Sequence, residues 1–138
     1  MNRKIILASH GDLSVGVLDS LRMIIGEIPY EIETYTLKSG NIAEDYANEL
    51  KKEIEQNPSK EYVIVTDVYG ASVCSAMYRL TEYNNVKLFT GMNLNMLLCI
   101  CMEHDHPLTN LDVDQIIEDS KKGVQSITLN TEEIEEDF

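Results

Sequence analysis

The sequence is poor in basic residues, and this shortage excludes two classes of partner. It contains 11 Lys and Arg against 24 Asp and Glu, so the formal net charge is −13. Nucleic-acid binding needs clustered Lys and Arg to neutralise phosphates, and attachment to an anionic membrane surface needs a basic patch. We therefore expect neither nucleic acid nor an anionic lipid surface among the partners.

Long hydrophobic runs and disulfide patterns are also missing. The longest apolar stretch, Leu94 to Met102, is interrupted by Asn95 and has about half the length that a membrane-spanning helix needs. The basic N-terminal segment has too short an apolar run for a signal peptide. The spacing of Cys74, Cys99 and Cys101 is not that of a disulfide scaffold. These absences favour a cytoplasmic protein with reduced thiols and no membrane insertion.

What remains is the composition of a folded domain. Apolar residues make up 43% and charged residues 25%, which is ordinary for a soluble domain. The 138 residues suffice for one domain, and no repeat or linker divides them. We expect a single domain over residues 1–130. The segment 131–138 carries five carboxylates and no base, so we expect a poorly ordered acidic tail there.

Strands and helices are expected to alternate along the chain. Continuous apolar runs predict strands that are buried on both faces, and apolar residues at helical spacing predict amphipathic helices. The expected strands are residues 5–8, 30–37, 62–66, 86–90 and 124–129. The expected helices are residues 13–25, 42–54, 73–80, 94–103 and 113–122. This order predicts an α/β protein with an open, mostly parallel sheet of four to five strands and helices on both faces.

Several local features refine these helices. Asn41 and Glu44 have the spacing of a capping box for the second helix, and Asp12 or Ser14 is expected to cap the first. The helix at 94–103 is apolar on nearly all sides, which indicates a buried helix or a helix in an interface.

Polar residues follow the first and third expected strands. In open parallel sheets, active sites lie beyond the carboxyl ends of the strands. His10 follows the first strand and Asp67 ends the third, so the two side chains converge if these strands are neighbours. A carboxylate bonded to one ring nitrogen fixes the tautomer of histidine and leaves the other nitrogen free to attack.

The surroundings indicate which group the histidine would attack. Two helices are expected to begin beside the pair, one after Gly11 and one after Gly70-Ala71-Ser72. Free backbone N–H groups at helix starts attract anions, and the Ser72 hydroxyl adds a donor. A phosphoryl group on histidine uses all these parts and needs no metal and no cofactor. The alternatives are an ordinary loop histidine, a capping role for Asp67 and an N-cap role for Ser72.

The order and spacing of three motifs resemble a known family. The motifs are Ser9-His10-Gly11 after the first strand, Asp67-x-x-Gly70-x-Ser72 after the third, and Gly91-Met92-Asn93 before the fourth expected helix. They resemble the IIA component of the mannose/fructose/sorbose-type bacterial sugar phosphotransferase system. The resemblance extends from about residue 3 to residue 130.

The resemblance implies a cytoplasmic phosphotransferase that works as a phosphocarrier for sugar transport. It would accept a phosphoryl group on His10 from the histidine-containing phosphocarrier protein and pass it to a IIB component. Asp67 would be the partner of His10. Ser72 and backbone N–H groups near Gly11 and Gly70-Ala71 would hold the phosphoryl oxygens. Family members are commonly homodimers that exchange a C-terminal strand, here residues 124–129.

The second motif departs from the family at two positions. The family usually has glycine-glycine-serine-proline where this chain has Gly70-Ala71-Ser72-Val73. We expect Ala71 to restrict the backbone where a second glycine was free, and Val73 lacks the fixed φ of a proline at the first helical position. Both changes are expected to alter the geometry of the loop.

Other functions also have to be compared with the sequence. The chain would also fit the phosphocarrier subunit of a dihydroxyacetone kinase, or a regulatory IIA-like binding module without a role in transport. A response-regulator receiver would need acidic metal ligands after its first strand, and a serine hydrolase would need G-x-S-x-G. Neither pattern is present. Cys99, Cys101, His104 and His106 resemble a metal cluster only in spacing, since helical residues two apart point apart; we expect buried cysteines and a polar loop.

Overall fold

The centre of the protein is an all-parallel, four-stranded sheet with the order β2-β1-β3-β4. A computed structural model describes residues 2–102 and 106–129. The strands are β1 (Arg3–His10), β2 (Glu31–Leu37), β3 (Glu61–Thr66) and β4 (Val86–Thr90). The predicted parallel α/β sheet is confirmed. Because β1 lies between β2 and β3, the carboxyl ends of the first and third strands are adjacent.

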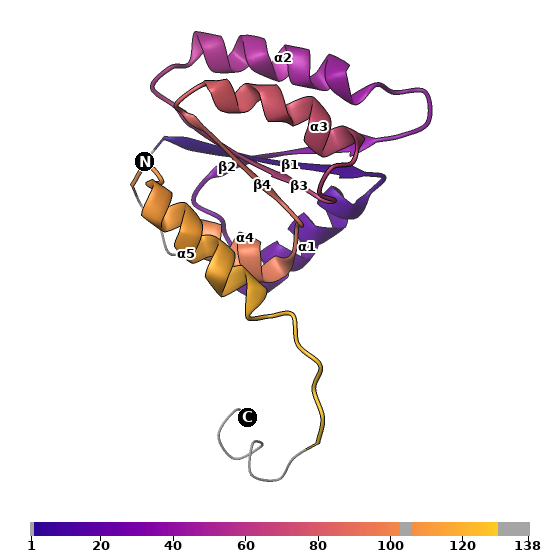
Figure 1. Ribbon diagram of the computed structural model, residues 1–138, viewed down its shortest axis with the longest axis vertical. Coiled ribbons are helices and arrows are strands. Elements are labelled where there is room, and N and C mark those ends of the chain that lie inside the picture. The colour runs from indigo at the N-terminus through magenta and orange to yellow at the C-terminus, as the bar shows by residue number, and fades with distance from the viewer. Residues whose placement is uncertain (1, 103–105, 130–138) are drawn as a thin grey trace.

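Helices cover both faces of the sheet, as the alternation of elements predicted (Figure 1). On one face lie α2 (Ala43–Gln56), α3 (Ser72–Met77) and the 3-10 helix η1 (Tyr78–Glu82). On the other face lie α1 (Leu13–Ile25), α4 (Leu94–Met102) and α5 (Asn110–Lys121). Among the described residues, no helix has the length and apolar character needed to cross a membrane.

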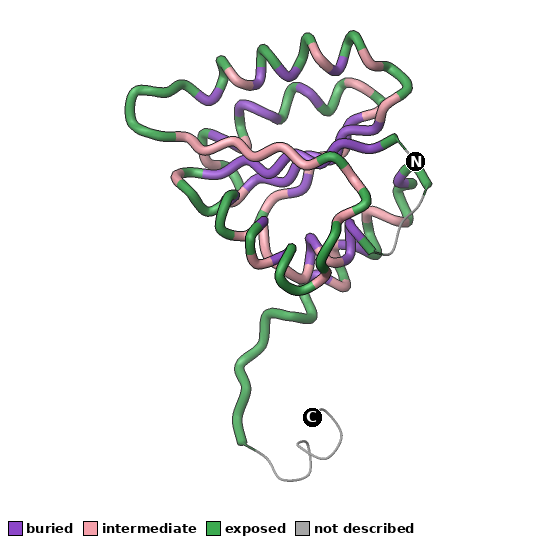
Figure 2. Tube along the Cα trace, turned by 180° about the vertical axis from the view of Figure 1, so that it is seen from behind, coloured by how far each residue is buried: buried purple, intermediate pink, exposed green. Residues whose placement is uncertain are grey.

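The central strand contributes to two separate hydrophobic cores. Ile5 and Leu7 pack in the core below α1 and α4, whereas Ile6 and Ala8 pack in the core below α2 and α3. Figure 2 shows the buried stretches of the sheet, in purple, in the middle of the molecule between the helices. Since side chains alternate between the faces of a strand, His10 extends on the α2–α3 side and Ser9 on the α1 side.

The apolar helix α4 is buried, which confirms the prediction made for it. It packs between the sheet, α1 and α5, and its side chains join the core on that face of the sheet. Cys99 and Cys101 are both buried there, and burial raises the pKa of the Cys101 thiol to about 11. Of the histidines considered beside them, His106 is exposed and His104 lies outside the described residues.

The prediction of a fifth strand at residues 124–129 is wrong for the described single chain. Residues 124–129 have no regular structure, and their apolar side chains Val124, Ile127 and Leu129 are exposed. In Figure 1 this segment runs away from the body of the molecule after α5. A strand needs a ladder partner as well as a β-branched pattern, and the described residues of the single chain supply none for this segment.

The capping box expected for α2 is also wrong. Ile42 occupies the cap position in an extended conformation, and the helix start has no side-chain cap from Asn41 or Glu44. A capping box is present instead at α5, where Thr109 Oγ1 accepts from the Asp112 N–H and the Asp112 carboxylate accepts from the Thr109 N–H. The spacing of a hydroxyl residue and an acid three positions later was the signal available in the sequence.

This cap predicts a pH-dependent contribution to stability. The N–H of Thr109 and, beyond it, the His106 ring hold the pKa of Asp112 at about 2, below the ordinary 3.8. The folded state therefore favours the ionised carboxylate, so the stabilisation is complete above about pH 4 and is lost as the pH falls towards 2. We expect Asp112→Asn to lower the Tm by a few degrees at pH 7 and by progressively less at lower pH.

Thermal unfolding between pH 7 and pH 2 measures this difference. Asp114→Asn is the matched control, because it removes the same charge from the exposed side of the same helix. A Tm difference for Asp112→Asn that stays constant down to pH 2 would contradict the assignment.

A buried ion pair closes the end of the sheet opposite the strands' carboxyl termini. Arg3 Nε donates to Glu61 Oε1 at 2.6 Å, which joins the beginnings of β1 and β3. The Arg3 guanidinium also donates to the carbonyl of His106 at 2.6 Å, and Glu61 Oε2 accepts from the Leu108 N–H at 2.8 Å. Both charges are thereby satisfied, and the chain leading into α5 is fixed against the sheet.

Candidate functional site

His10 and Asp67 meet at the carboxyl edge of the sheet. His10 is the last residue of β1, and Asp67 directly follows β3. The Asp67 Oδ2 atom accepts from the backbone N–H of His10 at 2.8 Å and lies 3.0 Å from His10 Nδ1. The pairing of β1 with β3 produces this contact, as the sequence predicted for neighbouring strands.

The environment of Asp67 keeps its carboxylate ionised. Its side chain is only 4% exposed, and this burial by itself raises the pKa. Hydrogen bonds from the backbone and ring of His10 and from the Val68 N–H outweigh burial, and the pKa of Asp67 falls below its ordinary value. An ionised carboxylate only accepts, so the neutral ring carries its proton on Nδ1. The Nε2 atom then has a free lone pair.

The second ring nitrogen faces Ser72. His10 Nε2 lies 3.2 Å from Ser72 Oγ, and Ser72 is the first residue of α3. The cap position of α3 belongs to Ala71, so Ser72 is not the N-cap that was considered as an alternative. The His10 side chain is 45% exposed. The ring nitrogen with a hydroxyl beside it therefore belongs to a side chain that an incoming group can reach.

The turn after His10 is held by buried hydrogen bonds. Gly11 has a φ of +56°, which a residue with a side chain rarely adopts. Its N–H donates to the Leu37 carbonyl at 2.8 Å, and its carbonyl accepts from Ser9 Oγ at 3.0 Å. The Ser9 hydroxyl also accepts from the Ser14 N–H at 2.8 Å. Ser9 belongs to the Ser9-His10-Gly11 motif, but the sequence did not reveal this role.

The start of α1 differs from the prediction because Ser9 takes the place of a side-chain cap. Asp12 holds the cap position, yet its side chain makes no cap and instead pairs with Lys38 at 2.7 Å. Ser14 lies inside the helix, where its hydroxyl donates to the Tyr35 carbonyl at 3.0 Å. A capping side chain would normally accept from the Ser14 N–H; here the hydroxyl of Ser9, at the end of β1, accepts from it instead.

The loop after β3 accommodates its two departures from the family pattern. Gly70 has a φ of +75°, and glycine is retained there. Ala71 has a φ of −81° and a ψ of 173°, which is extended backbone open to any residue. The expectation that Ala71 restricts the backbone of this loop is therefore wrong, because the loop needs no conformation that only glycine adopts at this position. Val73 is fully buried in the core below α2 and α3, so its side chain contributes packing.

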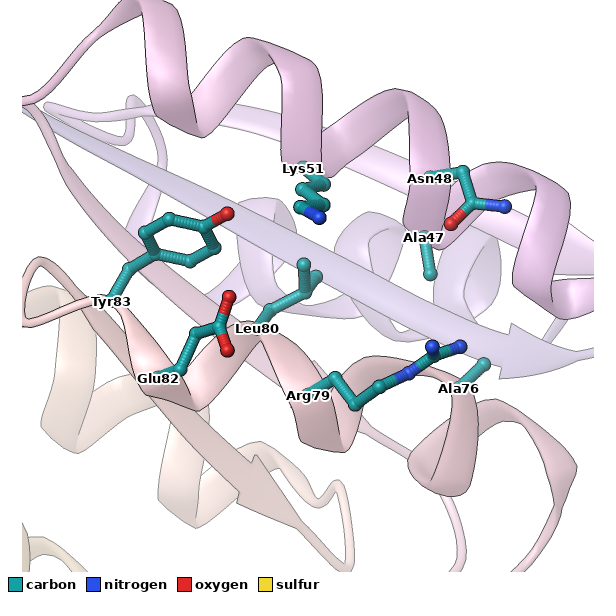
Figure 3. A pocket seen from close by; sticks show the side chains of 8 residues that line it. All are labelled: Ala47, Asn48, Lys51, Ala76, Arg79, Leu80, Glu82 and Tyr83. Carbon is teal, nitrogen blue, oxygen red and sulfur yellow. The ribbon is translucent and has the colours of Figure 1, made fainter.

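The surface also has a hollow that contains none of the residues around His10. It lies between α2 and η1, and Figure 3 shows Lys51 of α2 facing Arg79 and Tyr83 across it. Its walls carry both signs of charge, with Glu82 beside the two cations. Over residues 2–102 and 106–129, no group of three or more His, Cys, Asp or Glu is arranged to hold a metal ion. The constellation around His10 is the chemically distinctive site of the described chain.

Comparison with known proteins gives consistent relatives. Residues 4–117 match the sequence model of a family described as PTS system fructose IIA component, where PTS is the phosphotransferase system. The PTS system sorbose-specific EIIA component of Klebsiella pneumoniae is 25% identical over 134 residues, which are 96% of this chain and 97% of the relative.

Solved structures of similar proteins share the fold. The mannose/sorbose specific IIA subunit of the phosphotransferase system from Enterococcus faecalis has a TM-score of 0.72 and 24% identity, covering 94% of this chain and 98% of that one. The phosphotransferase system component EIIA from Streptococcus agalactiae has a TM-score of 0.73 and 27% identity, covering 90% of this chain and 96% of that one.

Proposed function

The chain belongs to the family of PTS fructose IIA components, and we propose that it carries a phosphoryl group on His10 between two other proteins of that system. The observation that supports this most is the His10 ring, which has an ionised carboxylate at Nδ1 and an unprotonated Nε2 that faces the Ser72 hydroxyl. The half-exposed ring lies on open surface, which suits a donor and an acceptor that are proteins.

The accepting step follows from this geometry. The lone pair of His10 Nε2 forms the new N–P bond, while the N–P bond of the donor's phosphohistidine breaks and leaves its electron pair on the donor's imidazole. The proton on Nδ1 stays in place, so the phosphorylated ring becomes cationic. The Asp67 carboxylate stabilises that charge, as an aspartate does beside the histidine of a serine-protease triad. The donor in this proposal is the histidine-containing phosphocarrier protein.

Donors around the ring would hold the phosphoryl oxygens. The Ser72 hydroxyl next to Nε2 turns from the nitrogen to the incoming oxygens. Backbone N–H groups beyond Gly11 and in the Gly70-Ala71 loop add further hydrogen bonds. The Gly11 N–H itself is already engaged by Leu37, so the groups that follow it carry this role. The step needs no metal and no cofactor.

Intact mass spectrometry tests this function directly. The protein is incubated with phosphoenolpyruvate, enzyme I and the histidine-containing phosphocarrier protein. We expect one added phosphoryl group that is labile in acid and stable in base, as expected for phosphohistidine. Absence of any adduct would contradict the proposal and leave a regulatory binding module. The acceptor of the phosphoryl group then separates the alternatives. Transfer to a IIB component, which would occur in the cytoplasm, would indicate a role in sugar transport, and transfer to a dihydroxyacetone kinase subunit would indicate the other function.

We also propose that two copies form a homodimer through residues 124–129. These residues leave the body with Val124, Ile127 and Leu129 exposed, which a single chain does not explain. In the described part of the chain, β4 is one of the two edge strands of the sheet and pairs only with β3. Open strand edges pair readily with another extended chain. A second copy would supply both the strand and the edge.

The oligomeric state is measured by light scattering at micromolar concentration. We expect about twice the 15.7 kDa chain mass for the full protein. Truncation after Gly123 is expected to yield a monomer, because it removes the pairing segment. Truncation after Asn130 is the control, since it removes only the acidic tail and is expected to leave the dimer intact. A monomeric full-length protein would contradict the proposal.

A further inference from the structure

We infer that Ser9 is a positioning residue for His10, acting through the turn that follows the histidine. This inference rests on the proposed function and deepens it, because it names a residue that supports His10 from the other face of β1. Asp67 holds the ring at Nδ1, and Ser72 lies at Nε2, where the phosphoryl group would arrive. Ser9 lies on the opposite face of β1 and never meets that group.

The Ser9 hydroxyl joins two backbone groups that have to stay in place. Ser9 is fully buried, and its Oγ donates to the Gly11 carbonyl while accepting from the Ser14 N–H. One hydroxyl therefore fixes the turn and the first turn of α1 against the end of β1. The side chain at the cap position does not replace it, because Asp12 is directed to Lys38.

The turn at Gly11 is one of two backbone supports of His10. The backbone N–H of His10 is held by Asp67 Oδ2. On the other side, Gly11 adopts a positive φ and is fixed by Leu37 at its N–H and by Ser9 at its carbonyl. Loss of the Ser9 bond leaves Gly11 held at one end only. The ring can then swing about the Cα of His10, and its Nδ1 no longer stays on Asp67.

The expected kinetic effect lies in the transfer step itself. Misplacement of a reacting group by about 1 Å reduces rates by about 100-fold. We expect Ser9→Ala to lower the transfer rate at saturating donor by about 10- to 100-fold, per folded molecule. The donor concentration at half-saturation should stay the same, because the buried hydroxyl makes no contact with a docked protein.

Two further variants separate positioning from simple loss of stability. Ser9→Thr keeps the hydroxyl and is expected to restore most of the rate. Ser14→Ala is the matched control, since it removes an equally buried hydroxyl one turn away while keeping the backbone N–H that donates to Ser9. It is expected to lower the Tm without changing the transfer rate of the folded protein. Circular dichroism gives the folded fraction of each variant.

A spectroscopic readout tests the inference even without phosphoryl transfer. Long-range 1H–15N NMR of the unphosphorylated protein reports which ring nitrogen of His10 carries the proton. We expect a single Nδ1–H tautomer in the wild type and in Ser14→Ala, and a mixture in Ser9→Ala. If the wild type accepts no phosphoryl group, the proposed function fails, and the NMR comparison alone decides the role of Ser9. Unchanged His10 signals in Ser9→Ala, or an equal loss in Ser14→Ala, would overturn the inference.

Discussion

A His10→Ala variant is expected to take up no phosphoryl group at all from the phosphoenolpyruvate-driven relay. The wild type supplies a nitrogen lone pair at the carboxyl edge of the sheet, and the methyl side chain of alanine supplies none. The fold should survive, because the side chain is half-exposed and lies outside both hydrophobic cores. Intact mass after incubation measures the loss, which should be complete within detection.

His106→Ala is the matched control for this experiment. His106 is also about half-exposed and also pairs with a carboxylate, since its Nε2 lies 2.9 Å from Asp112 Oδ2. We expect it to be phosphorylated like the wild type. An acid-labile adduct that persists in His10→Ala would move the acceptor to another histidine, and a base-labile adduct would indicate an acyl phosphate on Asp67.

Asp67→Asn is expected to slow the transfer by about two to four orders of magnitude, as the equivalent change does beside the histidine of a serine protease. Asp67 Oδ2 accepts from both the backbone and the ring of His10, and Oδ1 accepts from the Val68 N–H. An asparagine has one oxygen only. If that oxygen faces His10, the amide NH2 opposes the Val68 N–H; if it faces Val68, the NH2 opposes His10 and favours the tautomer that protonates Nε2.

Either orientation also removes the negative charge that stabilises the cationic phosphorylated ring. Single-turnover transfer from the phosphorylated donor measures the rate. Asp112→Asn is the control, because it changes the carboxylate of the other His–Asp pair and leaves the site untouched. A transfer rate within threefold of the wild type would show that Asp67 neither orients nor stabilises His10. An unfolded Asp67→Asn protein would instead give Asp67 a structural role.

Most of the fold was predictable because burial leaves a strong pattern in this sequence. Ile5 to Ala8 form a continuous apolar run, since β1 is covered on both faces, and the same holds for β3. The failure at residues 124–129 has a physical cause, because local pattern records the tendency to extend and not the presence of a partner strand. The capping box predicted for α2 failed because the spacing of Asn41 and Glu44 does not fix where the helix begins, and Ile42 occupies the cap position.

The candidate site was predictable in part. His10 and Asp67 follow from strand ends, and their contact follows once β1 and β3 are neighbours. The support from Ser9 was not predictable, because its hydroxyl bonds depend on the turn at Gly11 and the beginning of α1 coming together in space. The sequence shows only a serine that continues the apolar run of β1 directly before His10, and its burial became evident in the structure.

The ion pair at the other end of the sheet has a consequence for how the protein is made. Arg3 is synthesised well before its partner, because the carbonyl that it contacts lies 103 positions later in the chain. At about 5–20 residues per second, that contact waits for roughly 5–20 seconds of synthesis. Early in this interval the central strand β1 has been synthesised and its neighbour β3 has not, and the His106 carbonyl follows only at the end of the interval. Translation speed and early chaperone contact should therefore influence the yield of native protein more than they would if β1 were at the edge.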